Sequence, residues 1–198
     1  MSDWNRLATD LLERAELSSF EAVLDSAFGS KDDGHRSRVR EDLQRKIARA
    51  TNENLPPGYD SIADLKRRPR VDGWALSISH CPGLGGYVLG PSKNFVGFDL
   101  EESVRVTEKI VERVLPFELE KSWFPTSGIQ PALIWAAKEA SIKAFGNLTR
   151  SDLNFTLVEI TSFNRDGRFT SRHRHHHAHG VAASWGAYTA AVAITRPE

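Results

Sequence analysis

The first third of the chain spaces its apolar residues with a helical period. In two stretches, one near the N-terminus and one over the charge-rich residues 36–49, apolar residues three or four apart would share one helix face. They are Leu7, Leu11 and Leu12, then Val39, Leu43 and Ile47. Between these stretches, Ser18 and Glu21 stand in capping-box spacing ahead of Gly29, which predicts a further helix over 18–29.

After a loop at 52–59 that contains proline and glycine, apolar residues recur at every second position instead of every third or fourth. Trp74, Leu76 and Ile78 alternate with small or polar residues, which predicts a half-buried strand. Two short apolar runs on either side of a turn predict two more strands, over 87–89 and 95–100. A helical stretch over 106–123, interrupted at Pro116, completes this middle part of the chain.

The last third predicts one strong helix and then strands. Residues 129–145 have a helical pattern, with Pro131 near its start and Gly146 just after its end. Alternation over 153–157 and an apolar run over 188–194 predict strands, with a turn at 164–167. Helices and strands are segregated along the chain, which is typical of an α+β fold rather than a doubly wound parallel sheet.

Charge and cysteine content narrow the class of protein. Among 198 residues, Lys plus Arg and Asp plus Glu each number 26, so no net charge draws the protein to nucleic acid or to an anionic membrane. A single cysteine, Cys81, cannot form an internal disulfide and favours a reducing compartment. The N-terminal residues lack the apolar segment of a signal peptide, and no run is long enough to span a bilayer. We therefore expect a cytoplasmic protein.

Three acidic residues and a lysine are candidates for chemistry. Asp99 and Glu101 are two apart on a predicted strand, so their side chains share a face. The preceding Gly97 would allow another backbone to approach closely. Glu139 lies in the apolar helix, and Lys143 is one turn further along on the same face.

Each pair has a simple structural interpretation when it is judged alone. Glu139 and Lys143 would be an exposed i, i+4 pair, and Asp99 and Glu101 the solvated face of an edge strand. Together, three converging carboxylates would repel one another and require a cation. Oxygen ligands suit Mg²⁺, and a neighbouring lysine suits phosphate. This combination fits displacement at phosphorus, where catalysis depends mainly on positioning and charge neutralisation.

Four ordered motifs carry a resemblance to a known family. Residues 96–101, VGFDLE, resemble the (V/I)-G-(I/V/F)-D-x-E signature of 4′-phosphopantetheinyl transferases, and 135–143, WAAKEASIK, resemble their W-x-x-K-E-(A/S)-x-x-K signature. Ser79-His80 and Arg68-Pro69 are similar to upstream elements of the larger, surfactin-synthetase-activating type. The resemblance covers about residues 66–198. About 95 residues precede the first signature, which favours this monomeric, single-chain type over the trimeric holo-acyl-carrier-protein synthase type.

The resemblance implies a fold of two pseudo-twofold-related lobes, each with a small antiparallel sheet packed on a helix. Residues 1–94 would form a lobe that is helical and then has two strands, and it would bind the nucleotide end of coenzyme A. This lobe is shorter than usual, and its basic contacts cannot be located in the sequence. Residues 95–198 would form the lobe with the metal and catalytic residues.

The resemblance also implies an activity and a role for each site residue. The enzyme would move phosphopantetheine from coenzyme A to a serine of an apo acyl or peptidyl carrier protein, releasing 3′,5′-ADP. Its metal would be Mg²⁺, with Mn²⁺ as an alternative. The implied metal ligands are Asp99, Glu101 and Glu139; the implied catalytic residues are Glu139 and Lys143; the implied coenzyme A contacts are Arg68, Ser79, His80, Lys138 and Lys143.

Two other functions remain open on the sequence alone. One is a binding module for coenzyme A or a carrier without chemistry, and the other is a Mg²⁺-dependent phosphohydrolase. The histidine-rich residues 173–179 are interpreted as a solvated hairpin connection or a loose metal binder. A Cys81-His80 dyad is poorly arranged, because adjacent strand residues point to opposite faces. Arg105, Lys109 and Arg113 are candidates for contact with an acidic carrier helix.

Overall fold

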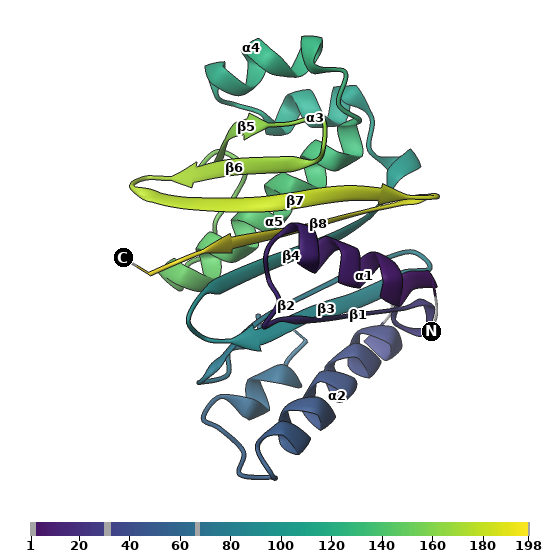
Figure 1. Cartoon of the computed structure of the whole chain (residues 1–198), viewed down its shortest axis with the longest axis vertical. Helices are drawn as coiled ribbons and strands as arrows, with labels where there is room; N and C mark the ends of the chain where they lie inside the picture. Colours follow the sequence, from purple (N-terminus) through teal and green to yellow (C-terminus); the bar gives the residue numbers. More distant parts are fainter. Residues whose placement is uncertain (1–2, 30–32, 66–67, 198) are drawn as a thin grey trace.

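The structure is a computed structural model that describes residues 3–29, 33–65 and 68–197. Its strands form two antiparallel sheets, and both sheets have helices packed on them (Figure 1). The mixed fold confirms the α+β prediction. The helices are α1 Asp3–Arg14, α2 Asp33–Ala50, α3 Glu108–Val114, α4 Glu118–Ser127 and α5 Pro131–Thr149, with 3₁₀ turns at η1 Ser26–Phe28, η2 Tyr59–Ile62 and η3 Ser103–Arg105.

The smaller sheet has three strands in the order β1-β3-β2, and the larger has five in the order β4-β8-β7-β6-β5. The chain passes from the first sheet to the second through the turn between β3 and β4, next to the predicted lobe boundary at 94/95. The strands are β1 Glu21–Asp25, β2 Trp74–Cys81, β3 Leu84–Pro91, β4 Phe95–Glu102, β5 Glu159–Phe163, β6 Arg168–His173, β7 His176–Trp185 and β8 Tyr188–Thr195.

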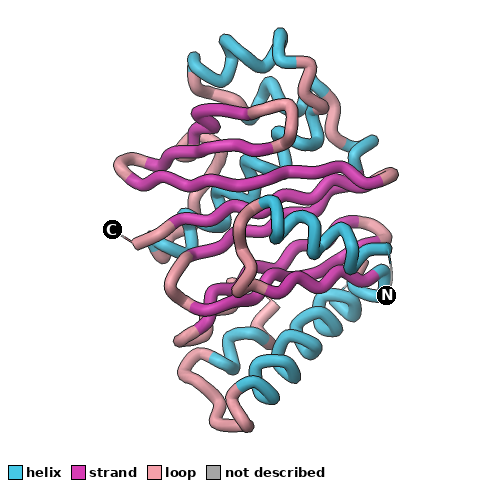
Figure 2. The backbone as a smooth tube through the Cα atoms, viewed as in Figure 1, coloured by secondary structure: helices cyan, strands magenta, loops and turns pink. Residues whose placement is uncertain are grey.

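One long helix packs on each sheet. The apolar face of α2, with Val39, Leu43 and Ile47, lies against Tyr87 and Leu89 of β3. Helix α5 lies on β4 and β8 and covers the face of the large sheet opposite α1 (Figures 1 and 2). Each sheet therefore has its own helix and its own apolar core, as the resemblance implied.

A third core lies under α1 and joins the two sheets. Leu7 and Leu11 of α1 pack with Val88 of the small sheet and with Phe98 and Val192 of the large sheet. These side chains are almost entirely removed from water, and each buried large apolar side chain contributes on the order of 1.5–3 kcal/mol. Helix α1 thereby holds together the two sheets whose facing edges carry the site.

The helix predicted over 18–29 is wrong. Residues 21–25 form β1, which pairs antiparallel with β3, and a short 3₁₀ turn follows. The side chain of Asp25 accepts a hydrogen bond from the Ala27 N–H at 2.8 Å and so caps that turn. Leu24 packs toward the α1 core and Val23 toward the α2 core, so burial on both faces outweighs the local capping-box signal.

Two predictions in the last third also need correction. Residues 153–157 form no strand; Leu153 and Phe155 pack on Phe145 and Val158 while the backbone turns, and β5 begins only at Glu159. Helix α5 continues past Gly146 to Thr149 and is followed by Arg150 in the left-handed conformation, with φ 54°. Gly146 is a packing position, because a Cβ there would come within 2.1 Å of Arg68 Nη1.

Candidate active site

One stripe of α5 carries the polar residues that face the junction of the two sheets. Trp135, Glu139, Lys143 and Asn147 are spaced four apart, so they lie one above another along the helix. The helix comes very close to β4, since a Cβ on Gly97 would be 1.9 Å from the carbonyl oxygen of Ala140. Glycine at this position is what allows the stripe to reach the strand that carries Asp99 and Glu101.

Lys143 binds Asp99, the most buried of the three carboxylates. Its Nζ donates to Asp99 Oδ1 at 2.7 Å, to the Phe98 carbonyl oxygen at 3.0 Å and to Ser79 Oγ at 3.1 Å. An ammonium has three hydrogens, so all of its donors have acceptors within the protein. Asp99 is 4% exposed, and its second oxygen, Oδ2, is buried with no hydrogen-bond partner in the described part of the chain.

Glu101 and Glu139 lie within electrostatic reach of Asp99. The indole Nε1 of Trp135 donates to Glu101 Oε1 at 3.0 Å. Burial, together with the charge of Asp99, raises the pKa of Glu101 to about 7. Burial and Asp99 also raise the pKa of Glu139, against the opposing effects of Lys143 and Arg68. Burial raises the pKa of Asp99, while Lys143 lowers it. The region thus concentrates negative charge that Lys143 and Arg68 only partly balance.

Side chains join the two sheets along a seam between β2 and β4, which lie side by side but belong to different sheets. Ser77 Oγ accepts from the Phe98 N–H at 2.9 Å, and Ser79 Oγ accepts from the Leu100 N–H at 3.1 Å. From α5, Asn147 Nδ2 donates to the carbonyl oxygens of Val96 at 2.9 Å and Leu76 at 3.3 Å. The seam places the carboxylates beside the small sheet.

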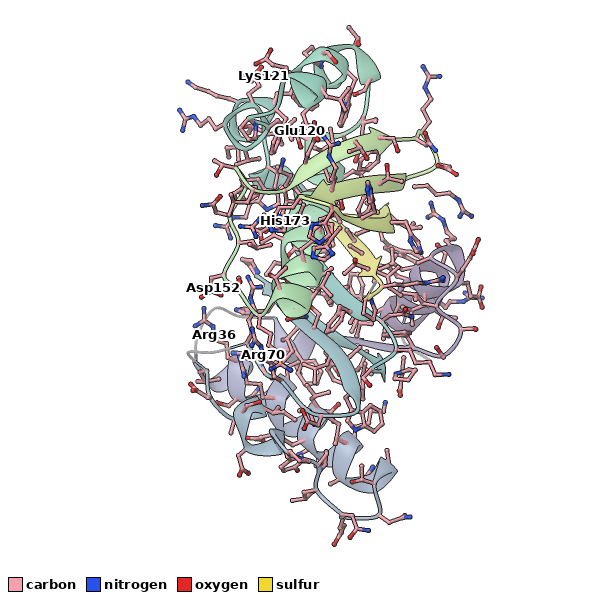
Figure 3. All side chains as sticks on the ribbon, turned by 90° about the vertical axis from the view of Figure 1, so that its left-hand side faces the viewer. Arg36, Arg70, Glu120, Lys121, Asp152 and His173 are labelled. Carbon is pink, nitrogen blue, oxygen red and sulfur yellow. The ribbon has the colours of Figure 1, made fainter. Side chains whose placement is uncertain are left out.

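A cleft of about 720 Å³ opens on the small-sheet side of this seam. Four arginines from α2 and from the segment before β2 line it together with His80 and Lys143. Arg36 Nε donates to His80 Nε2 at 3.1 Å. Figure 3 shows Arg36 and Arg70 near one another on one face of the molecule, with Asp152 beside them. The four arginines are Arg36, Arg40, Arg68 and Arg70.

A sequence profile described as "4′-phosphopantetheinyl transferase superfamily" matches residues 95–193, half of the chain. The chain belongs to this superfamily. An acyl carrier protein synthase from Mycobacterium tuberculosis has a solved structure that is 24% identical to this chain. The match covers 52% of this chain and 96% of that chain, with a TM-score of 0.37. No curated protein sequence matches.

Most of the transferase motif residues gather at the seam and the cleft. Asp99, Glu101, Glu139 and Lys143 form one charged group at the seam, while Arg68 and His80 line the cleft. Arg68 Nη1 is buried and has no hydrogen-bond partner among the residues described. Within 3–29, 33–65 and 68–197, no three Asp, Glu, His or Cys side chains are already arranged to hold a metal ion.

Two of the predicted coenzyme A contacts lie elsewhere. Lys138 is fully buried and forms an ion pair with the equally buried Glu120 of α4, because its position on α5 is about 100° around the helix from Glu139. We withdraw it as a phosphate contact. Ser79 is 6% exposed and lies beneath the cleft wall, and its hydroxyl donates to Asp99 Oδ1 at 3.0 Å. Ser79 therefore joins β2 to β4 at the seam and does not line the cleft.

Sequence reasoning missed Arg36, Arg40 and Asn147. Arg36 and Arg40 are four apart on a helix with many charges, and only the packing of α2 shows that this face lines the cleft. For Asn147, its spacing of four from Lys143 was the available signal for a role in the same stripe.

The remaining candidates have structural explanations. His173 is 3% exposed, and its Nδ1 lies 2.6 Å from the Leu157 carbonyl oxygen, so this histidine ties the end of β6 to the segment before β5. Burial and nearby carboxylates, Glu101 first, raise the pKa of the Cys81 thiol to about 12, which disfavours the nucleophilic thiolate. Of the helices described, none is both long and apolar enough to cross a membrane.

Proposed function

We propose that this protein transfers the phosphopantetheine group of coenzyme A to a serine of an apo acyl or peptidyl carrier protein. The observation that carries the proposal is the single helix stripe that joins a carboxylate group to an arginine-lined cleft. On this stripe, Lys143 binds Asp99 and lines the cleft, and Glu139 lies one helical turn from Lys143, within electrostatic reach of Asp99. Family membership supports phosphopantetheinyl transfer in general.

The cleft is suited to the phosphorylated nucleotide end of coenzyme A. Arginine presents several N–H donors in a fixed geometry that matches phosphate oxygens. Arg36 and His80 form one pair at its wall. Arg68, whose Nη1 has no hydrogen-bond partner among the described residues, lies within electrostatic reach of Glu139. We propose that the Arg36–His80 pair receives the 3′-phosphate of coenzyme A and that Arg68 receives the pyrophosphate.

The carboxylate group fits a divalent cation. Asp99 Oδ2 is buried and has no partner within the described ranges, and three carboxylates with raised pKa values lie together. We propose that Asp99, Glu101 and Glu139 hold Mg²⁺ or Mn²⁺ with the pyrophosphate of the substrate. The ion, when bound, would polarise the phosphate oxygens and neutralise developing charge.

Glu139 is the proposed base for the carrier serine. It takes the serine proton, directly or through a water, as the serine oxygen forms a bond to the β-phosphorus that bears pantetheine. The bond from this phosphorus to the oxygen of the departing 3′,5′-ADP breaks. Lys143 stabilises the leaving phosphate, and to do so its ammonium must exchange one of its three protein acceptors for a phosphate oxygen.

The carrier would approach along α3, which follows β4 and its glutamates. Arg105, Lys109 and Arg113 are exposed on this segment and could meet an acidic helix. Charge reversal at Arg113 should raise the KM for the carrier several-fold and leave the KM for coenzyme A unchanged. An unchanged carrier KM would remove α3 from the docking surface. We expect the protein to act as a cytoplasmic monomer.

One assay separates this proposal from its alternatives. The protein is incubated with coenzyme A, Mg²⁺ and an apo carrier, and the carrier is weighed by mass spectrometry. A gain of one phosphopantetheine that is lost in Glu139→Gln supports transfer. Binding of coenzyme A without a mass gain would instead indicate a binding module, and coenzyme A breakdown without a carrier would indicate a phosphohydrolase.

A further inference from the structure

A buried ion pair on the opposite side of α5 from the cleft has no part in the proposed chemistry. The side chains of Lys138 and Glu120 are both 0% exposed. Glu120 Oε1 also accepts the Ile160 N–H of β5 at 2.7 Å, and Glu120 Oε2 accepts the Phe117 N–H at 3.4 Å. Lys138 Nζ lies 5.1 Å from the centre of the Phe117 ring. One carboxylate thus connects α4, α5 and β5.

Such a pair is an inefficient way to stabilise a core. Removing two charges from water costs several kcal/mol each, and replacing a buried pair by apolar side chains of similar volume is often neutral or stabilising. The better-attested use of a buried polar group is to select one arrangement of elements over others that pack nearly as well.

The face that α5 presents to the large sheet gives a reason why such selection is needed here. Where it meets β7 and β8, this face presents small side chains to other small side chains, so few protruding side chains interlock there. These residues are Ala136, Ala137, Ala140 and Ala144 on the helix and Ala182, Ala191 and Ala193 on the strands. The larger side chains of the same core, Ile160 and Phe169, come from β5 and β6. A smooth interface allows close approach but defines rotation and sliding of the helix weakly.

Rotation of α5 decides where Glu139 points. Lys138 immediately precedes Glu139, and a turn of the helix that released Lys138 from Glu120 would carry Glu139 and Trp135 away from β4. We infer that the Lys138–Glu120 pair is a positioning device that sets the rotation of α5 and so directs Glu139 and Trp135 at Asp99 and Glu101. This inference rests on the proposed function for its catalytic consequence but not for its structural one.

The test is the double variant Glu120→Gln/Lys138→Met, which removes both charges, keeps similar volumes and retains an oxygen for the Ile160 N–H. Its thermal midpoint should equal or exceed that of the wild type. The kcat for carrier modification should fall at least tenfold while the KM for coenzyme A changes less than threefold. The indole N–H resonance of Trp135, assigned with Trp135→Phe, should move as its hydrogen bond to Glu101 is lost.

The matched control is Glu118→Gln/Lys121→Met, which removes an exposed pair, 2.9 Å apart, from the same helix α4. Lys121 is labelled in Figure 3. This control should leave kcat and the Trp135 resonance unchanged. A folded Glu120→Gln/Lys138→Met protein with wild-type kcat and an unmoved resonance would overturn the inference. If this double variant does not fold, Glu120→Gln alone must show the same losses, and wild-type behaviour of this variant overturns the inference. If the wild type transfers nothing, the proposed function fails while the resonance still tests the positioning.

Discussion

The two sheets and their helices have the same construction and opposite electrostatic roles. In each, a long helix packs its apolar face on an antiparallel sheet, of three strands in one case and five in the other. Helix α2 contributes Arg36 and Arg40 to the cleft, whereas α5 and β4 contribute carboxylates at the seam. The arginines and the carboxylates come together at the seam, where β2 meets β4.

The difference indicates a division of labour. The arginine side offers fixed cations that suit binding of a polyanion, and the carboxylate side offers groups with raised pKa values that suit a metal and a proton transfer. Substitutions in the two halves should therefore change different kinetic constants. Lys143, which lines the cleft and holds Asp99, is the residue at which the two roles meet.

The largest effect is expected on the carboxylate side. Glu139→Gln removes the proposed base and should lower kcat by about 100- to 10,000-fold, the usual contribution of a positioned general base. Steady-state rates of carrier modification measure this effect. A fall in coenzyme A affinity without a fall in kcat would instead mean that Glu139 serves binding. It would contradict the assignment of catalysis to the carboxylate side.

The second effect belongs to the arginine side. Arg36→Gln removes the donor to His80 and should raise the KM for coenzyme A about 10- to 100-fold, with kcat changed less than threefold. Hydrogen bonds to charged groups contribute about 1.5–3 kcal/mol, which sets this range. Arg38→Gln is the matched control, because Arg38 is exposed on the same helix and does not line the cleft. Equal effects of the two substitutions would mean that Arg36 has no specific contact with coenzyme A and that the cleft acts only through its general positive charge.

A third prediction concerns stability and pH in the metal-free protein. The pKa of Glu101 is raised from 4.5 to about 7, so the folded state binds its proton more tightly than the unfolded chain does. This contribution to stability is fully present below pH 4.5 and is lost as the pH rises to 7. Glu101→Gln should therefore stabilise the protein above pH 7, by about 1–2 kcal/mol after allowance for partial exposure, and by little near pH 4.

Denaturant unfolding at pH 5 and pH 8 with a chelator present measures that difference. A stabilisation that is the same at both pH values would mean that Glu101 does not titrate in this range. Excess Mn²⁺ should reverse the order at pH 8, because the ion stabilises the wild type, which keeps the ligand.

The smallest effect is expected at Gly146. A Cβ in Gly146→Ala would meet Arg68 Nη1 at 2.1 Å and the Ser151 carbonyl oxygen at 2.9 Å. The arginine can move but the Ser151 backbone must shift slightly, so we expect a two- to fivefold loss of coenzyme A affinity and about 1 kcal/mol of destabilisation. Unchanged affinity would show that the position of Arg68 at the wall of the cleft does not matter for binding.

The sequence predicted those parts of the molecule whose local pattern and tertiary environment agree. The strand over 95–100 and the helix over 129–145 carry strong periods and known motifs, and both exist. Residues 18–29 failed because β1 is defined by pairing with β3 and by two covered faces, which are contacts distant in sequence. The prediction that Lys138 contacts phosphate was wrong for a related reason. A motif gives the residue type but not the direction in which the side chain leaves the helix.

The arginines of α2 show the same limit for the site. Arg36 and Arg40 lie outside the motifs, and a helix with charges on several faces does not reveal which face will line a cleft. The group of carboxylates, Asp99, Glu101 and Glu139, could be predicted because its members fall on two elements whose facing sides follow from the spacing. The nucleotide side depends on how α2 packs across the small sheet, which no local pattern encodes.

The division of labour is tested most directly by calorimetric titration of coenzyme A, with Mg²⁺ and no carrier, into the wild type, Glu139→Gln and Arg36→Gln. We predict that the wild type and Glu139→Gln bind coenzyme A with Kd values within about threefold of each other. The Kd of Arg36→Gln should be about 10- to 100-fold higher. Loss of binding in Glu139→Gln together with wild-type affinity in Arg36→Gln would contradict the assignment of binding to the arginine side and chemistry to the carboxylate side.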